Sequence, residues 1–255
     1  MYQPRVIPCL LVRGNGLVKT KKYKNAVYIG DPVNAVRIFS EKEADEIIVL
    51  DIDASRLGRE PNYGLVAEMA GEAFMPMAYG GGIRSVSEIR KLIRSGVEKV
   101  VINTELTKSV DVVRAAVDIF GSQAIVGAVD VKRKLFGGYS VMAQSATVET
   151  GIDLKRHIDN LVQAGVGEVF INDVDRDGVM EGYDLSLVRS VVQQTPVPVV
   201  ICGGAGSMEH LVQAINDGGA SAVAAGSMFV FHGKHRAVLI SYPKAVELKR
   251  AFSKS

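Results

Sequence analysis

The stretch Ala124–Arg133, AIVGAVDVKR, lies near the middle of the 255-residue chain and indicates how the chain is built. Six apolar or small residues, Ala124 to Val129, are followed by a single carboxylate, Asp130. Apolar runs of this kind are typical of parallel strands that are covered by helices. In a barrel of such strands, an acid at the carboxyl end points into the mouth, where barrel active sites form. We therefore expect Asp130 to belong to a functional site.

Seven further apolar runs lie on either side of this stretch, separated by segments with helix periodicity. With Ala124–Asp130, the predicted strands are Val6–Leu10, Ile47–Asp51, Met75–Tyr79, Val100–Asn103, Val169–Asp173, Val197–Cys202 and Ala222–Ala225. The predicted helices are Pro32–Lys42, Asn62–Glu72, Ser87–Ser95, Val110–Phe120, Leu154–Ala164, Leu185–Gln194 and Met208–Asp217. Eight alternating units predict an α/β fold, a closed (β/α)8 TIM barrel, with an open doubly wound sheet as the alternative.

An internal repeat favours the closed barrel. Gly80–Gly82 follows the third strand and Cys202–Gly204 the seventh, and each is followed by a serine and a helix. The acids around the second strand also match those around the sixth, Glu46 and Asp51 with Glu168 and Asp173. The chain therefore reads as two half-barrels. No linker separates them, so residues 1–255 are predicted to form one domain.

Composition excludes several classes of protein. A net charge of +2, with 47% hydrophobic and 23% charged residues, gives no reason to expect nucleic-acid binding. No apolar run approaches the ~20 residues of a membrane-spanning helix, and the first residues lack a signal-peptide pattern. The two cysteines, Cys9 and Cys202, do not form a CxxC motif, and we interpret them as core residues. We expect a cytoplasmic protein with no membrane insertion.

Two long inserts follow the first and fifth strands at the predicted mouth. Val12–Tyr28 is rich in lysine and includes Lys19, and Lys132–Gly151 allows a small hairpin. They are either plain surface loops or functional loops, and their length favours function.

Glycine clusters suggest where a ligand binds. Glycine lets backbone N–H groups approach an oxyanion, and the helix that follows adds its positive end. The clusters are Gly203, Gly204 and Gly226-Ser227 in one half and Gly81, Gly82, Asn103 and Thr104 in the other. Two such sites predict an elongated ligand with a phosphate at each end. The alternative is that these glycines only make tight turns.

Charged side chains gather at both ends of the predicted strands. At the carboxyl ends stand Asp51, Asp130, Asp173, Asp175 and Asp177, which either do acid–base chemistry or cap turns and helices. Arg5, Glu46, Lys99 and Glu168 each precede an apolar strand. They could form an ion-pair ring across the barrel floor, although spacing alone favours independent solvated charges. The four histidines, at positions 157, 210, 232 and 235, do not suggest a metal site, and we expect no metal or other cofactor.

The chain resembles one known family along nearly its whole length. The runs that carry the resemblance are RVIPCL, GLVKT, DPV, DEIIVLDIDAS, GGGIRS, KVVINT, FGSQAIVGAVDVKR, DRDG, GYD and ICGGAGSMEH. They resemble HisF, the cyclase subunit of imidazole glycerol phosphate synthase. The resemblance implies a TIM barrel, a phosphorylated small-molecule ligand with two phosphates, and a HisH-like glutaminase partner in a heterodimer that supplies ammonia.

The resemblance also assigns roles to residues of this sequence. It implies catalytic roles for Asp130 and Lys19, and Asp51 is a further catalytic candidate because it ends an apolar strand. It implies one phosphate site at Gly82, Asn103 and Thr104, and another at Asp177, Gly178, Gly204, Ala225 and Gly226. Arg5, Glu46, Lys99 and Glu168 match the family's ionic gate for ammonia, which reverses the preference for solvated charges at these four positions.

One catalytic position departs from the family. HisF has CLD where this chain has Cys9-Leu10-Leu11, so Leu11 replaces the aspartate that pairs with Asp130. Loss of one of two acid–base groups costs roughly 10²–10⁴ in rate, and Asp173 is a hypothetical replacement acid. The opening also resembles a HisF-like branch found in surface-polysaccharide gene sets, where ammonia goes to an ATP-dependent sugar amidotransferase.

Three functions remain open. The first is ammonia delivery for conversion of a sugar's acetamido group to an acetamidino group. The second is a genuine cyclase, a lyase of histidine biosynthesis. The third is a catalytically silent activator of the glutaminase.

Overall fold

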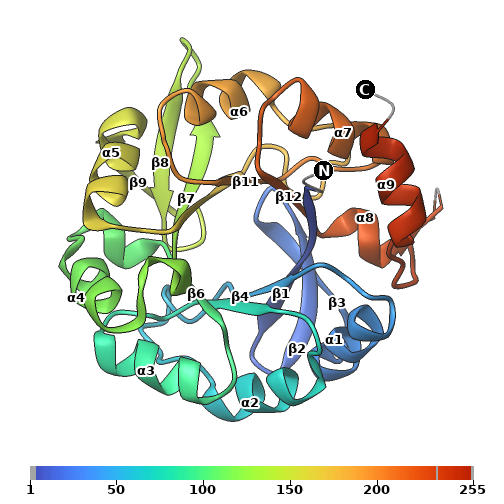
Figure 1. Cartoon of the computed structure of the whole chain (residues 1–255), viewed down its shortest axis with the longest axis horizontal. Coiled ribbons are helices and arrows are strands. Elements are labelled where there is room, and N and C mark those ends of the chain that lie inside the picture. Colours follow the sequence, from blue (N-terminus) through green and yellow to red (C-terminus); the bar gives the residue numbers. More distant parts are fainter. Residues whose placement is uncertain (1–3, 234, 254–255) are drawn as a thin grey trace.

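Eight parallel strands close into a barrel in the computed structural model, which describes residues 4–233 and 235–253 (Figure 1). Around the barrel the strands are β1 (Arg5–Arg13), β4 (Ile47–Asp51), β5 (Met77–Gly80), β6 (Lys99–Ile102), β7 (Ile125–Arg133), β10 (Glu168–Asp173), β11 (Val199–Cys202) and β12 (Ala222–Ala225). Pairing of β10 with β7 and of β12 with β1 joins the two halves of the ring. The predicted (β/α)8 TIM barrel is confirmed, and the open sheet is wrong.

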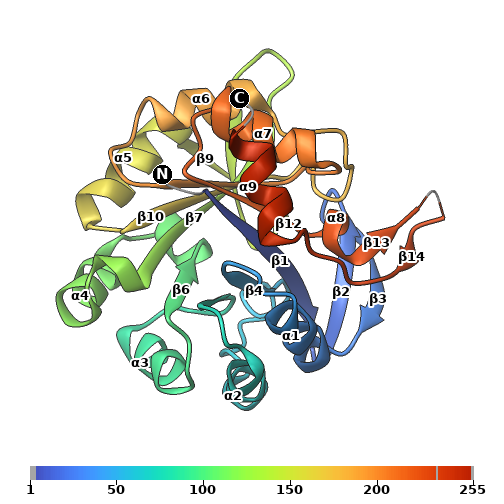
Figure 2. The ribbon, with the colours of Figure 1, turned by 45° about the vertical axis from the view of Figure 1, so that its right-hand side comes forward.

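Helices cover the outside of the barrel in every view (Figures 1 and 2). They are α1 (Pro32–Glu41), α2 (Tyr63–Glu72), α3 (Val86–Arg94), α4 (Asp111–Phe120), α5 (Leu154–Ala164), α6 (Leu185–Val192), α7 (Met208–Asn216), α8 (Ser227–Val230) and α9 (Ala245–Ser253), with short 3-10 turns at Thr104–Thr107 and Ser122–Ala124. Six of these helices begin at a side chain that accepts a hydrogen bond from the first turn: Asp31, Asn62, Ser85, Asp153, Asp184 and Ser207. Such caps satisfy backbone N–H groups that have no partner inside the helix.

The alternation of side chains along each strand separates two cores. Residues such as Val6, Val49 and Val129 face outward and pack under the helices. Ile7, Ile48, Val101, Val126, Phe170, Val200 and Ala222 are among those that face inward and fill the barrel. The side-chain period of a strand is two. The charges at the strand starts and the polar groups at the strand ends therefore face the barrel interior, on the same side of each strand as this inner core.

The two long inserts are ordered β-ribbons. After β1, the chain continues through β2 (Gly16–Lys21) and β3 (Lys24–Gly30), which pair antiparallel. After β7, it continues through β8 (Tyr139–Ala143) and β9 (Val148–Asp153). The hairpin that Lys132–Gly151 allows is confirmed. Val12–Tyr28 forms paired strands, and this was not predicted from the lysine-rich sequence.

The end of the chain differs most from the prediction. A small hairpin of β13 (Phe231–His232) and β14 (Ala237–Val238) leads to α9, and none of these elements was predicted. Tyr242, just before α9, donates a hydrogen bond to the carbonyl oxygen of Val6 at 2.8 Å. This contact holds the last segment against the start of β1.

None of the described helices combines the length and apolar character needed to cross a lipid bilayer.

The free energy of unfolding should depend on pH through His157, which is buried in α5. Burial lowers the pKa of His157 from 6.5 to about 4. The unfolded chain therefore binds the proton first as the pH falls, so stability is full above pH 6.5 and is lost toward pH 4, by up to about 3 kcal/mol. Urea unfolding of His157→Phe and of the wild type at pH 7.5 and 5 should show a smaller loss in the variant. The exposed His232→Gln should behave as the wild type does, and an equal loss in His157→Phe would contradict the assignment.

Candidate functional site

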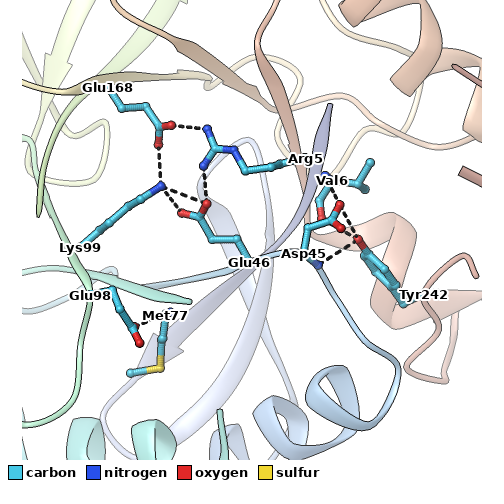
Figure 3. A network of polar contacts seen from close by, with 9 residues as sticks. All are labelled: Arg5, Val6, Asp45, Glu46, Met77, Glu98, Lys99, Glu168 and Tyr242. Atoms are coloured by element: carbon cyan, nitrogen blue, oxygen red, sulfur yellow. Dashed lines mark hydrogen bonds and ion pairs between the residues drawn. The ribbon is translucent and has the colours of Figure 1, made fainter. Parts of the chain in front are cut away.

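The floor of the barrel carries a closed ring of four charged side chains (Figure 3). Arg5 pairs with Glu46 and with Glu168, and Lys99 lies opposite, 2.8 Å from Glu46 Oε1 and 3.6 Å from Glu168 Oε1. Both glutamates are buried. Removing one member of such a buried set leaves an uncompensated charge and costs several kcal/mol. The four charges act as one network, and their interpretation as independent solvated charges is wrong.

At the opposite end, the mouth holds two cavities. The first lies over β4, β5 and β6 and is lined by Asp51, Gly82, Asn103, Thr104 and Asp130 together with Tyr23, Leu50, Ser55 and Ser145. The second lies over β1, β11 and β12 and is lined by Leu11, Lys19, Asp177, Gly178, Gly204, Ala225 and Gly226 together with Tyr23, Leu50, Asn172 and Ser227. The two predicted glycine clusters are thus each brought together, one in each cavity.

The second cavity contains two polar groups that suit an anion. The ammonium of Lys19 is buried and donates to the carbonyl oxygen of Cys9 at 3.0 Å, a neutral partner. It occupies the space that a side chain at Gly226 would need, because a Cβ there would lie 1.8 Å from Lys19 Nζ. The hydroxyl of Ser227 is buried and has no hydrogen-bond partner among the described residues. Both groups are what a phosphate oxygen would bind.

Asp130 projects from β7 into the mouth, as predicted, and lies in a polar cluster. Its Oδ1 accepts from the hydroxyl of Tyr23 at 3.0 Å and from Nδ2 of Asn172 at 3.1 Å. Burial raises the pKa of Asp130 from 3.8 to about 6, although these hydrogen bonds lower it in part. A carboxyl group with a pKa near the working pH can accept or donate a proton, as a general base or acid must.

The structure places Asp51 and Asp173 in matching positions in the two halves. Asp51 Oδ1 accepts from the backbone N–H groups of Asp53 and Ala54, both at 2.9 Å. Asp173 Oδ1 accepts from the N–H of Asp175 at 3.0 Å, and Arg176 approaches its other oxygen at 3.6 Å. Both acids therefore brace turns. Asp51 still lines the first cavity, whereas Asp173 lines neither cavity, so this geometry does not favour it as a replacement acid.

Asp177 fixes the β2–β3 ribbon over the mouth. Its Oδ2 accepts from the hydroxyl of Thr20 at 2.5 Å and from the N–H of Tyr23 at 3.1 Å, and its carbonyl oxygen accepts from Lys22 at 2.9 Å. This carboxylate therefore holds the ribbon in place at the edge of the second cavity.

The turn interpretation of the glycines holds at Gly82 and Gly204. Both have positive φ angles, +74° and +118°, and a Cβ would lie 2.5 Å and 2.2 Å from backbone oxygens. Only glycine fits these turns without strain. The steric need neither requires nor excludes a phosphate, so phosphate binding stays a prediction.

Sequence reasoning missed two members of the Asp130 cluster. Asn172 could have been found by counting along β10 in steps of two, because Glu168 in the floor ring, Phe170 and Asn172 share the inner face. Tyr23 gave no comparable signal, since its position depends on how the ribbon folds back. Cys9 and Cys202 are buried and free in the barrel, as expected of core residues. Within residues 4–233 and 235–253, no three His, Cys, Asp or Glu side chains could hold a metal ion.

Comparison with known proteins shows extensive similarity. A family model described as "Histidine biosynthesis protein" matches residues 5–236. The chain is 52% identical over 248 residues to "Putative imidazole glycerol phosphate synthase subunit hisF2" of Pseudomonas aeruginosa, covering 97% of this chain and 99% of that protein. It is 44% identical over 253 residues to "Putative imidazole glycerol phosphate synthase subunit HisF" of Leptospira interrogans, covering 99% and 100%. It is 42% identical over 252 residues to "Putative imidazole glycerol phosphate synthase subunit hisF3" of Vibrio vulnificus, covering 98% and 97%.

Asp130 should lower the stability of the protein at neutral and alkaline pH. Because folding raises its pKa from 3.8 to about 6, the folded protein binds the proton more tightly. Stability is therefore lost as the pH rises through this range, by up to about 3 kcal/mol. Asp130→Asn should be more stable than the wild type at pH 8 and equal to it below pH 4, as measured by thermal unfolding. An Asn variant that is less stable at pH 8 would contradict the raised pKa.

Proposed function

Because the chain belongs to the histidine biosynthesis protein family and is a HisF-like synthase subunit, we propose that it receives ammonia through the floor of its barrel and releases it at the mouth. The closed ring of Arg5, Glu46, Lys99 and Glu168 is the observation that carries this proposal. Ammonia made by a glutaminase on this face would meet four charges that block water and ions until one contact opens. The contact between Lys99 and Glu168, at 3.6 Å, is the longest of the four ion pairs in the ring.

The barrel interior suits a small neutral molecule. Above the ring, the inward side chains are mainly aliphatic, with Phe170 as the aromatic member. Such a lining favours ammonia over ammonium, because transferring an ion into an apolar environment carries a large desolvation cost. When ammonium loses a proton to become ammonia at the ring, Glu46 and Glu168 can share that proton, although both already bind two cations.

We propose a HisH-like glutaminase as the partner, docked on the face that carries the ring. The acceptor we favour is the acetamido group of a surface-polysaccharide sugar, converted to an acetamidino group with the help of an ATP-dependent amidotransferase. Support comes from Leu11, which packs with Val18 and Ile52 at the mouth and offers no acid–base group opposite Asp130. A subunit that only delivers ammonia does not need a second acid there.

A specific observation also favours the cyclase as a second candidate. The mouth holds two cavities with glycine turns, and the second contains the Lys19 ammonium and the Ser227 hydroxyl, which has no hydrogen-bond partner among residues 4–233 and 235–253. Two cavities, each with a glycine turn, suit a ligand with a phosphate at each end. Asp130, with its pKa near 6, would be the remaining acid–base group of a ring closure.

A mutation that breaks the ring should lower the fraction of glutamine-derived ammonia that reaches the mouth. It should not prevent the reaction at the mouth from using ammonia supplied in solution. In the complex with the HisH-type glutaminase of the same genome, Glu46→Gln removes one of the two carboxylates that Arg5 and Lys99 share and leaves only Glu168 between them. We expect less 15N from amide-labelled glutamine in the product per glutamine hydrolysed, by about tenfold, while turnover with free ammonium salt stays unchanged. Glu60→Gln, which removes an exposed pair with Lys91, is the matched control. Unchanged 15N transfer in Glu46→Gln would reject the gate and favour a silent activator.

The cyclase candidate has its own test. The chain is mixed with the bis-phosphate ribonucleotide of the cyclase reaction and ammonium salt at alkaline pH, and formation of the imidazole product is measured. On the delivery proposal, the wild type should be slower than a two-aspartate cyclase by about 10²–10⁴. Leu11→Asp should then recover part of the rate. Wild-type turnover equal to that of a two-aspartate cyclase would reject delivery as the primary function.

A further inference from the structure

The two cavities of the mouth share a wall. Tyr23 and Leu50 line both of them, whereas Asp130 lines only the first and Asn172 only the second. Tyr23 comes from the tip of the β2–β3 ribbon, and Leu50 comes from the barrel strand β4. Leu50 is fixed by the barrel, so Tyr23 is the part of the wall that can move.

Several contacts hold Tyr23 in this wall. Lys22 and Tyr23 have positive φ angles of 54° and 57°, a conformation that is unfavourable for residues other than glycine. The backbone N–H groups of these two residues donate to Asp177, at 2.9 Å and 3.1 Å. The ribbon tip is therefore strained by itself and depends on contacts with the loop after β10.

The hydroxyl of Tyr23 completes the wall across the barrel axis. It donates to Asp130 Oδ1 at 3.0 Å and accepts from Nδ2 of Asn172. A hydrogen bond to a charged acceptor is stronger than one between neutral groups. Burial and the nearby Asp130 carboxylate raise the pKa of Tyr23 well above 10, so its hydroxyl remains a donor.

We propose that Tyr23 determines which ligands the mouth admits. With Tyr23 bonded to Asp130, each cavity is separate and takes a ligand with a single phosphate. A ligand with a phosphate at each end can bridge the cavities only after the bond between Tyr23 and Asp130 breaks and the ring leaves the wall.

This division has a thermodynamic consequence. The apparent affinity for a bridging ligand is reduced by the fraction of molecules in which the wall is open. Each lost hydrogen bond to a charged group is worth about 1.5–3 kcal/mol, so the reduction is about tenfold or more. A ligand confined to one cavity does not break the bond. The inference concerns the site of the proposed function but needs neither glutaminase nor ammonia, so the two can fail separately.

Calorimetric titration tests the division with two probes, ribose 5-phosphate and the bis-phosphate ribonucleotide of the cyclase reaction. Tyr23→Phe keeps the ring and removes the hydroxyl, and Tyr23→Ala removes both. We expect both variants to bind the bis-phosphate about tenfold or more tightly than the wild type, with ribose 5-phosphate affinity changed by less than about threefold. Tyr28→Ala, an exposed residue of the same ribbon, should leave both affinities unchanged.

A second measurement separates this role from simple packing. Since the Tyr23 hydroxyl bond lowers the pKa of Asp130, the Asp130 carboxyl carbon in Tyr23→Phe should titrate above the wild-type value of about 6 by NMR. Equal bis-phosphate affinity in the wild type and both variants would overturn the proposal, and so would an unchanged Asp130 titration. Loss of binding of both ligands in Tyr23→Phe would also overturn it, because the Tyr23 hydroxyl would then be needed to bind ligands rather than to keep the two cavities apart.

Discussion

Closure of eight strands into one barrel sets the direction of every side chain at the floor and at the mouth. Once β7 pairs with β10 and β12 pairs with β1, every second side chain must point inward. Arg5, Cys9 and Leu11 therefore share one inner face of β1, and Glu168 and Asn172 share that of β10. The floor ring and the mouth are two ends of the same set of inward positions. A slip of one residue in β10, for example, would remove Glu168 from the ring and Asn172 from the mouth.

Buried charges are paired differently at the floor and at the mouth of the barrel. At the floor, two cations and two anions neutralise one another, and each glutamate contacts both cations. At the mouth, charges are left incompletely matched. In the part of the chain that the structure describes, Asp130 accepts hydrogen bonds from the neutral Tyr23 and Asn172, and Lys19 donates to a carbonyl oxygen. Incomplete matching costs stability, and groups that are held in this way are available to a substrate.

The two halves of the barrel resemble each other in their backbone turns and differ in the side chains at the mouth. Asp51 and Asp173 brace equivalent turns, and Gly82 and Gly204 fit equivalent close contacts. The β1 and β7 strands both continue into ribbons, but β1 presents Leu11 where β7 presents Asp130. The first ribbon then returns the hydroxyl of Tyr23 to Asp130. The asymmetry at the mouth therefore arises from one substitution and from one ribbon that folds inward.

Local sequence patterns predict the barrel, its eight strands, the inward position of Asp130 and the four charged residues at the strand starts. These features follow from local periodicity and from spacing, which are written in consecutive residues. The closure of the four charges into a ring, the turn contacts of Asp173 and the position of Tyr23 between the two cavities follow from the folded arrangement instead. The contact between Tyr23 and Asp130 joins residues 107 positions apart. Such contacts depend on the angle at which a ribbon leaves the barrel, and no local pattern encodes that angle.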